Sequence, residues 1–186
     1  LDSQCDDLRG RLETLLSSAR SGLAAQESAR TEARVHATRG EACMASHDYR
    51  GAIVSYEAAV ALDVNAAVLT SSYRSGAESA RAALTASLEA AHAKLAEGES
   101  AVAGKDWETG IACFGAGLSL DGMDDEELRS SLRASLESAE ASKAARDEAR
   151  EAAEGHVAEG RRRLSLREYG GAIAALEAGL SLDSQC

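Results

Sequence analysis

Cys43 and His47 form the first pair of side chains in this sequence whose types and spacing could do chemistry. Thiolate and imidazole groups are common protein ligands of zinc, and residues four apart in a helix lie on one face. A structural zinc ion needs four such ligands, however, and no third or fourth one follows at the spacing that zinc sites use. We therefore predict no metal site, and we interpret this pair as packed or idle.

Three further groups of residues have some features of known site types but lack the others. The glycines of Gly115–Leu118 lack the third glycine of a dinucleotide-binding loop, and we expect them inside a helix rather than after a strand. The carboxylates of Asp121–Glu127 lack the glycine and the alternating spacing of a calcium loop, so we interpret them as helix-capping residues. His36, His92 and His156 are accompanied by no nucleophile motif such as Gly-x-Ser-x-Gly. We predict no catalytic residues, no cofactor and no enzymatic activity.

The elements that would have to position such residues are predicted to be helices. The 186 residues include 40 alanines, no proline and few aromatic side chains, namely one Trp, one Phe and four Tyr. Alanine loses no side-chain entropy in a helix, and nothing in the composition breaks one. The composition therefore predicts an all-α protein whose core is built from small side chains.

The charge balance excludes some classes of partner. The chain has 31 acidic and 20 basic residues and a formal net charge of −11. Nucleic-acid binding depends on basic groups that neutralise phosphates, so we predict no nucleic-acid partner. No stretch approaches the ~18 consecutive apolar residues of a transmembrane helix, so we also predict no membrane span.

The four cysteines lie tens of residues apart with no Cys-x-x-Cys pair: Cys5, Cys43, Cys113 and Cys186. This spacing fits neither a disulfide framework nor a zinc site. Free thiols are typical of a reducing compartment. We therefore expect an intracellular location, cytoplasmic or cytoskeletal.

One pattern occurs three times in the chain with identical internal spacing. It consists of a glycine, an acidic residue followed by an aromatic one, an isoleucine and a closing Leu-Asp pair. The three copies are Gly40, Asp48-Tyr49, Ile53 and Leu62-Asp63; Gly98, Asp106-Trp107, Ile111 and Leu120-Asp121; and Gly160, Glu168-Tyr169, Ile173 and Leu182-Asp183. The period is about 60 residues, which is typical of a repeat architecture. We assign residues 1–5 to the end of a preceding repeat, 6–63, 64–121 and 122–183 to three repeat units, and 184–186 to the start of the next.

A longer period is indicated by the two ends of the sequence. The five residues from Leu1 to Cys5 recur letter for letter from Leu182 to Cys186, whereas the segments after Leu62 and Leu120 diverge. We hypothesise that three units form one super-repeat. In this hypothesis the sequence is a piece of a longer tandem array of near-identical super-repeats.

Each unit is predicted to contain a long helix followed by a short one that folds back on it. Leucines recur every fourth residue and so mark one face of the long helix, at Leu8, Leu12 and Leu16 and again at Leu128, Leu132 and Leu136. The segment from Asp6 to His47 contains no proline and no glycine-rich stretch that would interrupt the long helix. We predict turns at Ser46–Asp48, Gly104–Asp106 and Leu166–Glu168, each followed by a short helix that runs from the aromatic residue to the Leu-Asp pair.

The hairpin part of each unit resembles the tetratricopeptide repeat, a helix-turn-helix of ~34 residues. Gly40, Tyr49, Ala52, Tyr56 and Ala59 lie at the offsets where that family places its glycine, aromatic and small residues. The second copy carries Gly98, Trp107, Gly110, Phe114 and Gly117, and the third carries Gly160, Tyr169, Ala172, Leu176 and Gly179. The small residues let two helices approach closely, and the residue at the Tyr56 position fills the space beside them. The resemblance covers about half of each unit.

An extra segment separates successive hairpins, and the proline that the tetratricopeptide family places after its Leu-Asp pair is absent. This segment, clearest at Leu128–Glu140 and Tyr73–Glu78, resembles the third helix of the microtubule-interacting-and-trafficking (MIT) domain, a three-helix bundle. In this interpretation each third helix continues into the first helix of the next unit. The implied fold is a helical repeat array of the α-solenoid kind, with alternating long and short helices.

The resemblance implies that the first helix of each hairpin lines a protein-binding groove. The residues on this face are Arg34, Glu41, Met44, His92, Leu95, Glu99, Val102, Val157, Arg161 and Leu164. Ala37 and Glu41 stand where chaperone-binding members need a base and an amide, so an acidic peptide is a poor candidate ligand. A basic or amphipathic helix fits the charge better. The alternative is that these residues contact only the neighbouring repeat unit.

Two functions follow from this reading of the sequence. The first is a structural or scaffolding segment of a large tandem-repeat protein, an extended helical spacer or assembly module that contacts neighbouring repeats or assembles with itself. The near-identity of the two ends favours it, because a filament needs the same unit repeated. The second is an adaptor of the tetratricopeptide or MIT kind that accepts a partner helix.

Overall fold

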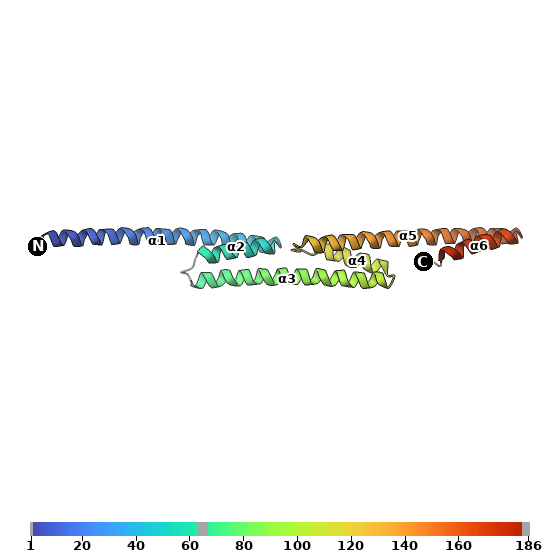
Figure 1. Cartoon of the computed structure of the whole chain (residues 1–186), viewed down its shortest axis with the longest axis horizontal. Helices are drawn as coiled ribbons and strands as arrows, with labels where there is room; N and C mark the ends of the chain where they lie inside the picture. Colours follow the sequence, from blue (N-terminus) through green and yellow to red (C-terminus); the bar gives the residue numbers. More distant parts are fainter. Residues whose placement is uncertain (1, 63–66, 184–186) are drawn as a thin grey trace. The chain divides into compact units, whose positions relative to one another are not determined.

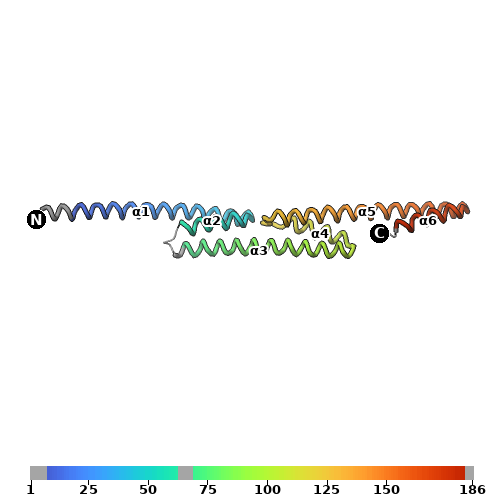
Figure 2. The backbone as a smooth tube through the Cα atoms, in the orientation of Figure 1, coloured from blue at the N-terminus to red at the C-terminus, as the bar shows by residue number. Residues whose placement is uncertain are grey.

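The computed structural model describes residues 2–62 and 67–183, and this part of the chain is all-α (Figure 1). Long and short helices alternate as predicted, and they contact mainly their neighbours in sequence, as in a helical repeat array. The helices are α1 (Asp2–Ala45), α2 (Tyr49–Leu62), α3 (Ala67–Ala103), α4 (Trp107–Leu118), α5 (Glu126–Ser165) and α6 (Tyr169–Asp183). The tube in Figure 2 shows α2 beside the second half of α1, and α6 beside the second half of α5.

The three predicted turns have one common geometry, that of the Schellman motif. In the last of them the backbone N–H of Arg167 donates to the carbonyl of Leu164 at 3.0 Å, and that of Glu168 donates to the carbonyl of Arg163 at 2.9 Å. The residue at the centre of each turn is left-handed but is not glycine: φ is 59° at His47, 62° at Lys105 and 62° at Arg167. The prediction of these turns is confirmed.

The acidic residue of the repeated pattern has two tasks in the turn. The backbone N–H of Asp48 closes the Schellman motif by donating to the carbonyl of Cys43 at 2.8 Å, and its Oδ1 accepts the N–H of Gly51 at 2.9 Å. Asp106 does the same with the carbonyl of Ala101 and the N–H of Thr109. One residue therefore ends the long helix with its backbone N–H and caps the short one with its side chain, and the cap explains why an acid precedes the aromatic residue.

We expect the substitution Arg167→Gly to raise the free energy of unfolding by about 0.5–1 kcal/mol, because glycine adopts the left-handed conformation without the steric cost that a Cβ atom brings. Urea unfolding followed by circular dichroism measures the change. Arg167→Ala keeps the Cβ and is the matched control, so it should give no gain. Equal stability of the two variants would show that the Cβ atom at this position does not destabilise the turn.

The chain divides into two compact units. Unit 1 comprises Leu1–Leu88 and Asp121–Asp124, and unit 2 comprises Glu89–Leu120 and Asp125–Cys186. The first part of α3 belongs to unit 1 and the rest of this helix to unit 2. The repeat boundaries assigned from the sequence are a separate description and remain a prediction.

The core of unit 1 is made where α3 lies on the α1–α2 hairpin. One cluster of buried residues joins Ala33, Ala37, Ala59 and Tyr73, and a second joins Ala52, Tyr56, Ala77 and Ala80. The ring of Tyr56 fills the space between two glycines: a Cβ atom on Gly40 would lie 2.9 Å from its Cε1 atom, and one on Gly76 would lie 2.8 Å from it. Burial, together with the negative charge of Glu41, raises the pKa of the Tyr56 hydroxyl. The close approach predicted at Gly40 is therefore present.

The segment Asp121–Asp124 packs on the α1–α2 turn in unit 1. Gly122 is left-handed, with φ of 70°, and lies against the ring of Tyr49. The side chain of Met123 beside it is only 2% exposed. Arg50 forms an ion pair with Asp124 at 3.0 Å. This segment therefore completes unit 1, although it follows α4 in the sequence.

In unit 2 the same packing recurs at two hairpins. Phe114 of α4 lies against Gly98 of α3, and Leu132 of α5 lies against Gly117, where an added Cβ atom would be 2.9 Å from the leucine Cδ2. At the second hairpin Leu176 of α6 lies against Gly160 of α5. The first half of α5 thus covers the α3–α4 hairpin, and its second half starts the hairpin with α6.

Candidate protein-binding surfaces

The residues predicted to form a binding face differ in their exposure to solvent. Exposed members are Arg34, Glu41, His92, Glu99, Val157, Arg161 and Leu164, and half-buried members are Met44, Leu95 and Val102. Met44 packs against the buried Ala52–Ala80 cluster of unit 1, and Val102 contacts Gly110. Part of the predicted face therefore holds the helices of this chain together.

Two pairs of the predicted residues come together in grooves. Glu99 and Val102 line a small groove with Phe114 and the α5 segment 134–139. Val157 and Arg161 line a larger groove of about 900 Å³ between α5 and α6. Arg34, Glu41 and His92 line neither of these grooves. The structure thus brings these two pairs of predicted residues together, but it does not join the whole predicted face into one surface.

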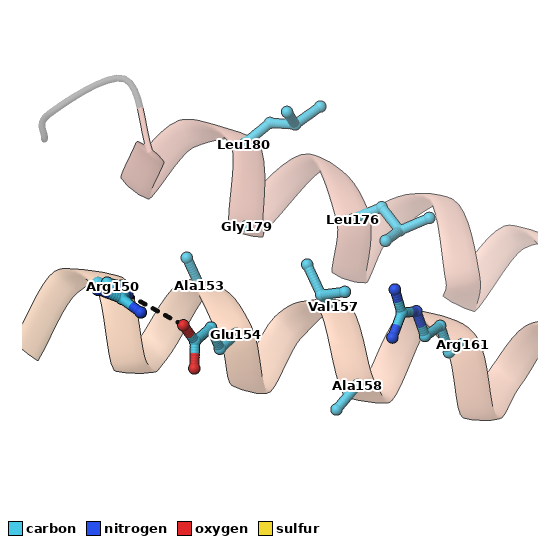
Figure 3. Close-up of a pocket in the computed structure, with 9 residues that line it drawn as sticks. All are labelled: Arg150, Ala153, Glu154, Val157, Ala158, Arg161, Leu176, Gly179 and Leu180. Atoms are coloured by element: carbon cyan, nitrogen blue, oxygen red, sulfur yellow. Dashed lines mark hydrogen bonds and ion pairs between the residues drawn. The ribbon is translucent and has the colours of Figure 1, made fainter.

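The larger groove, here called the α5–α6 groove, is lined by Arg150, Ala153, Glu154, Val157, Ala158, Arg161, Leu176, Gly179 and Leu180. Figure 3 shows the side chains of Ala153 and Val157 pointing from α5 toward α6. The floor is apolar, and the ion pair of Arg150 with Glu154, at 3.1 Å, lies at one end. Val157 is 38% exposed and Leu180 is 69% exposed. This is an apolar surface with charged edges, suited to a helix.

The residues that α6 contributes to this groove were not predicted from the sequence as site residues. Leu176 and Gly179 were assigned only to the contact between the two helices of the hairpin. The sequence did contain a signal, because the repeat register aligns Leu176 with Tyr56 and Gly179 with Ala59. Tyr56 and Ala59 are buried in unit 1, so their counterparts in α6 are expected to contact a third helix as well.

A second unpartnered apolar surface is the leucine stripe of α1. All residues from 8 to 25 are exposed. The stripe consists of Leu8 at 56% exposure, Leu12 at 53%, Leu15 at 66%, Leu16 at 53% and Leu23 at 56%. Single exposed leucines are ordinary on a protein surface, but five along one helix form a patch of the kind that marks an interaction site.

Carboxylates with lowered pKa values lie along the helices of unit 2. Hydrogen bonds from Arg162 and Arg163, at 2.8 and 2.7 Å, lower the pKa of Glu159 to about 2. The hydrogen bond from Thr109 lowers the pKa of Asp106, and that from Lys143 lowers the pKa of Asp147. Each group is a more stable anion in the folded chain than in the unfolded one.

We expect stability to decrease on acidification for this reason. A carboxylate whose folded pKa is lowered contributes stability above its unfolded pKa, and this contribution is lost as the pH falls toward the folded value. For Glu159 the window extends from the ordinary value of 4.5 down to about 2. Urea midpoints at roughly pH 6, 4 and 2.5 should fall in that order. The variant Glu159→Gln should lose less stability across this window, and an unchanged pH dependence would show that the Arg162–Glu159–Arg163 contacts contribute nothing.

The Cys43–His47 pair does not share a helix face, contrary to the geometry considered from the spacing. His47 lies beyond the end of α1 in the left-handed turn, where its Nδ1 is 2.9 Å from the hydroxyl of Tyr49. Gly115–Leu118 lies inside α4, as expected. Asp125 caps α5 by accepting the N–H of Leu128 at 2.9 Å, which confirms the capping role predicted for this acidic segment.

In the part of the chain that the structure describes, no helix combines the length and the apolar character needed to cross a bilayer. Comparison of the sequence with protein-family models and with curated proteins, and of the structure with solved structures, gave no match. The tetratricopeptide and MIT similarities therefore remain resemblances, and no family is assigned.

Proposed function

We propose that this chain is a structural or scaffolding segment of a tandem-repeat protein, which works as a helical spacer or assembly module through contacts between neighbouring repeats. One observation carries the proposal: a single long helix serves two hairpins. The first half of α5 buries Leu128, Leu132 and Ala139 beside α4, and its second half packs Gly160 against Leu176 of α6.

In unit 2 the α3–α4 hairpin and the α5–α6 hairpin therefore share one continuous helix. In α3 the early residues Tyr73, Ala77 and Ala80 complete the hairpin before it, and Gly98 then receives Phe114 of the hairpin after it. Stability in such an array is a sum of terms from each unit and its neighbours. A protein built this way can be lengthened by adding units, as a spacer or filament requires.

Solution scattering tests the proposal. A protein that carries two super-repeats in tandem is compared with the single chain at matched concentration. We expect the maximum dimension to increase roughly twofold, because the added units extend the array. A much smaller increase would contradict the spacer function and favour a superhelix with a concave binding face.

The α5–α6 groove supports a second candidate, an adaptor that binds a partner helix. A fluorescent amphipathic helical peptide is the appropriate probe, because the groove is apolar and has Arg150, Glu154 and Arg161 at its edges. The adaptor function predicts saturable binding that charge reversal at Glu154 or Arg161, which both line this groove, weakens. Binding that ignores both substitutions would contradict it.

A further inference from the structure

The α5–α6 groove lies where α3 packs in unit 1. In the register that matches Gly40 with Gly160, the residues Ala33, Ala37 and Ala59 correspond to Ala153, Val157 and Gly179. In unit 1 Tyr73 of α3 packs on those three alanines, whose exposure is 0, 7 and 0%. By contrast, 38% of Val157 is exposed. The α5–α6 groove is therefore the surface that the third helix covers in unit 1.

The exposed first half of α1 has the sequence of a third helix. Its residues Leu8, Leu12, Leu16 and Ala19 correspond to Leu128, Leu132, Leu136 and Ala139 of α5, three of which are buried in unit 2. The tripeptide Ser18-Ala19-Arg20 also repeats the tripeptide Ser79-Ala80-Arg81 of α3. The chain therefore carries a third helix with an exposed face and a hairpin with an exposed groove.

The sizes of the facing side chains match as well. In unit 1 the large Tyr56 faces Gly76, where an added Cβ atom would lie 2.8 Å from the ring. In unit 2 Phe114 lines a groove with Ser135, the counterpart of Gly76. At the α5–α6 groove the aromatic residue is replaced by the smaller Leu176, and the counterpart on α1 is the larger Leu15. The smaller side chain of Leu176 in the groove is thus compensated by the larger side chain of Leu15 on the helix, as close packing requires.

The charges agree with the same register. Arg81 of α3 forms an ion pair with Glu57 of α2 in unit 1. The counterparts of these two residues are Arg20 on α1 and Glu177 on α6. A helix docked in the groove in this register would bring opposite charges together at that position.

We infer that residues 8–20 of α1 dock in the α5–α6 groove of a second copy of this chain, head to tail. The inference rests on the proposed function, because it assigns the contact between successive super-repeats to these two surfaces. The two surfaces differ, so the contact is heterologous and each bound copy leaves one further helix and one further groove available. Repeated docking therefore produces linear oligomers.

A mixing experiment tests the proposal. Leu12→Glu blocks the helix face and leaves the groove, whereas Val157→Glu blocks the groove and leaves the helix. Both residues are exposed, so neither change should disturb folding, which circular dichroism checks.

We expect the unaltered chain to form larger species as its concentration rises in sedimentation velocity. Each variant alone should associate at least about tenfold more weakly. An equimolar mixture of the two should form a one-to-one dimer and nothing larger.

The matched controls are Val35→Glu and Val54→Glu, which replace exposed valines outside both surfaces and should leave association unchanged. Three outcomes would overturn the proposal: an unaltered chain that stays monomeric up to ~1 mM, variants that still associate alone, or a mixture that forms no dimer. The proposed function is judged separately by the scattering of the tandem protein. A monomeric single chain with an extended tandem array would remove this inference and leave the proposed function standing.

Discussion

Replacement of Phe114 by alanine is expected to lower the free energy of unfolding of unit 2 by about 3–5 kcal/mol. Phe114 is 1% exposed and lies against Gly98, and it is among the largest fully buried side chains described. Its removal leaves a cavity that the helix backbones cannot close, because the surrounding core consists of small residues that have little freedom to fill it.

Urea unfolding followed by the fluorescence of Trp107 measures this loss, since the only tryptophan lies in α4 with Phe114. Tyr169→Ala is the control, because Tyr169 is an aromatic residue with 61% exposure, and this change should stay within about 0.5 kcal/mol of the unaltered chain. A loss below about 1 kcal/mol for Phe114→Ala would mean that the site collapses freely.

The substitution Gly76→Leu is expected to destabilise unit 1 by about 2–3 kcal/mol. A leucine at this position must occupy the space of the Tyr56 ring, which is 8% exposed. The better helix propensity of leucine offsets only about 1 kcal/mol of this cost. Thermal and urea unfolding followed by circular dichroism give the size of the loss.

A double substitution identifies the cause. Tyr56→Leu alone leaves a cavity, but with Gly76→Leu it gives the combination of leucines that we infer for Leu176 and the docked Leu15, so the double variant should be at least about 1 kcal/mol more stable than the sum of the single losses predicts. Gly155→Leu is the control, because nothing lies within 4 Å of a Cβ atom there. Additive losses in the double variant would show that Gly76 and Tyr56 do not act on each other.

The helices and turns could be predicted because local signals agree at each of them. The leucine spacing, the lack of proline and the acid before each aromatic residue all indicate the same boundaries, and α1 ends at Ala45, before the predicted turn. One boundary differs from the prediction: α4 ends at Leu118, not at Leu120, and the N–H of Leu120 donates to the carbonyl of Gly117 at 3.4 Å, three residues back instead of the four of an α-helix.

The candidate surfaces were less predictable, because they depend on contacts that are missing from particular copies of the repeat. Val157 and Arg161 were identified by resemblance, but the stripe at Leu8 and Leu12 was read only as a core face of a helix. Its exposure depends on which hairpin is present beside it, and a periodic pattern carries no such information. The packing of Met123 on unit 1 was missed for a similar reason, because no local signal specifies where a connecting segment turns.

The predominance of alanine in the core has a consequence for how stability depends on temperature. Among the residues whose burial the structure describes, most of the buried apolar ones are alanines, such as Ala33, Ala52, Ala80 and Ala91. Unfolding therefore exposes less apolar area per residue than in a core of leucine and phenylalanine, and the heat capacity change should fall below the usual ~12–15 cal/mol/K per residue. A small heat capacity change flattens the stability curve, so this chain would hold nearly constant stability over a wide range of temperature and would resist unfolding in the cold.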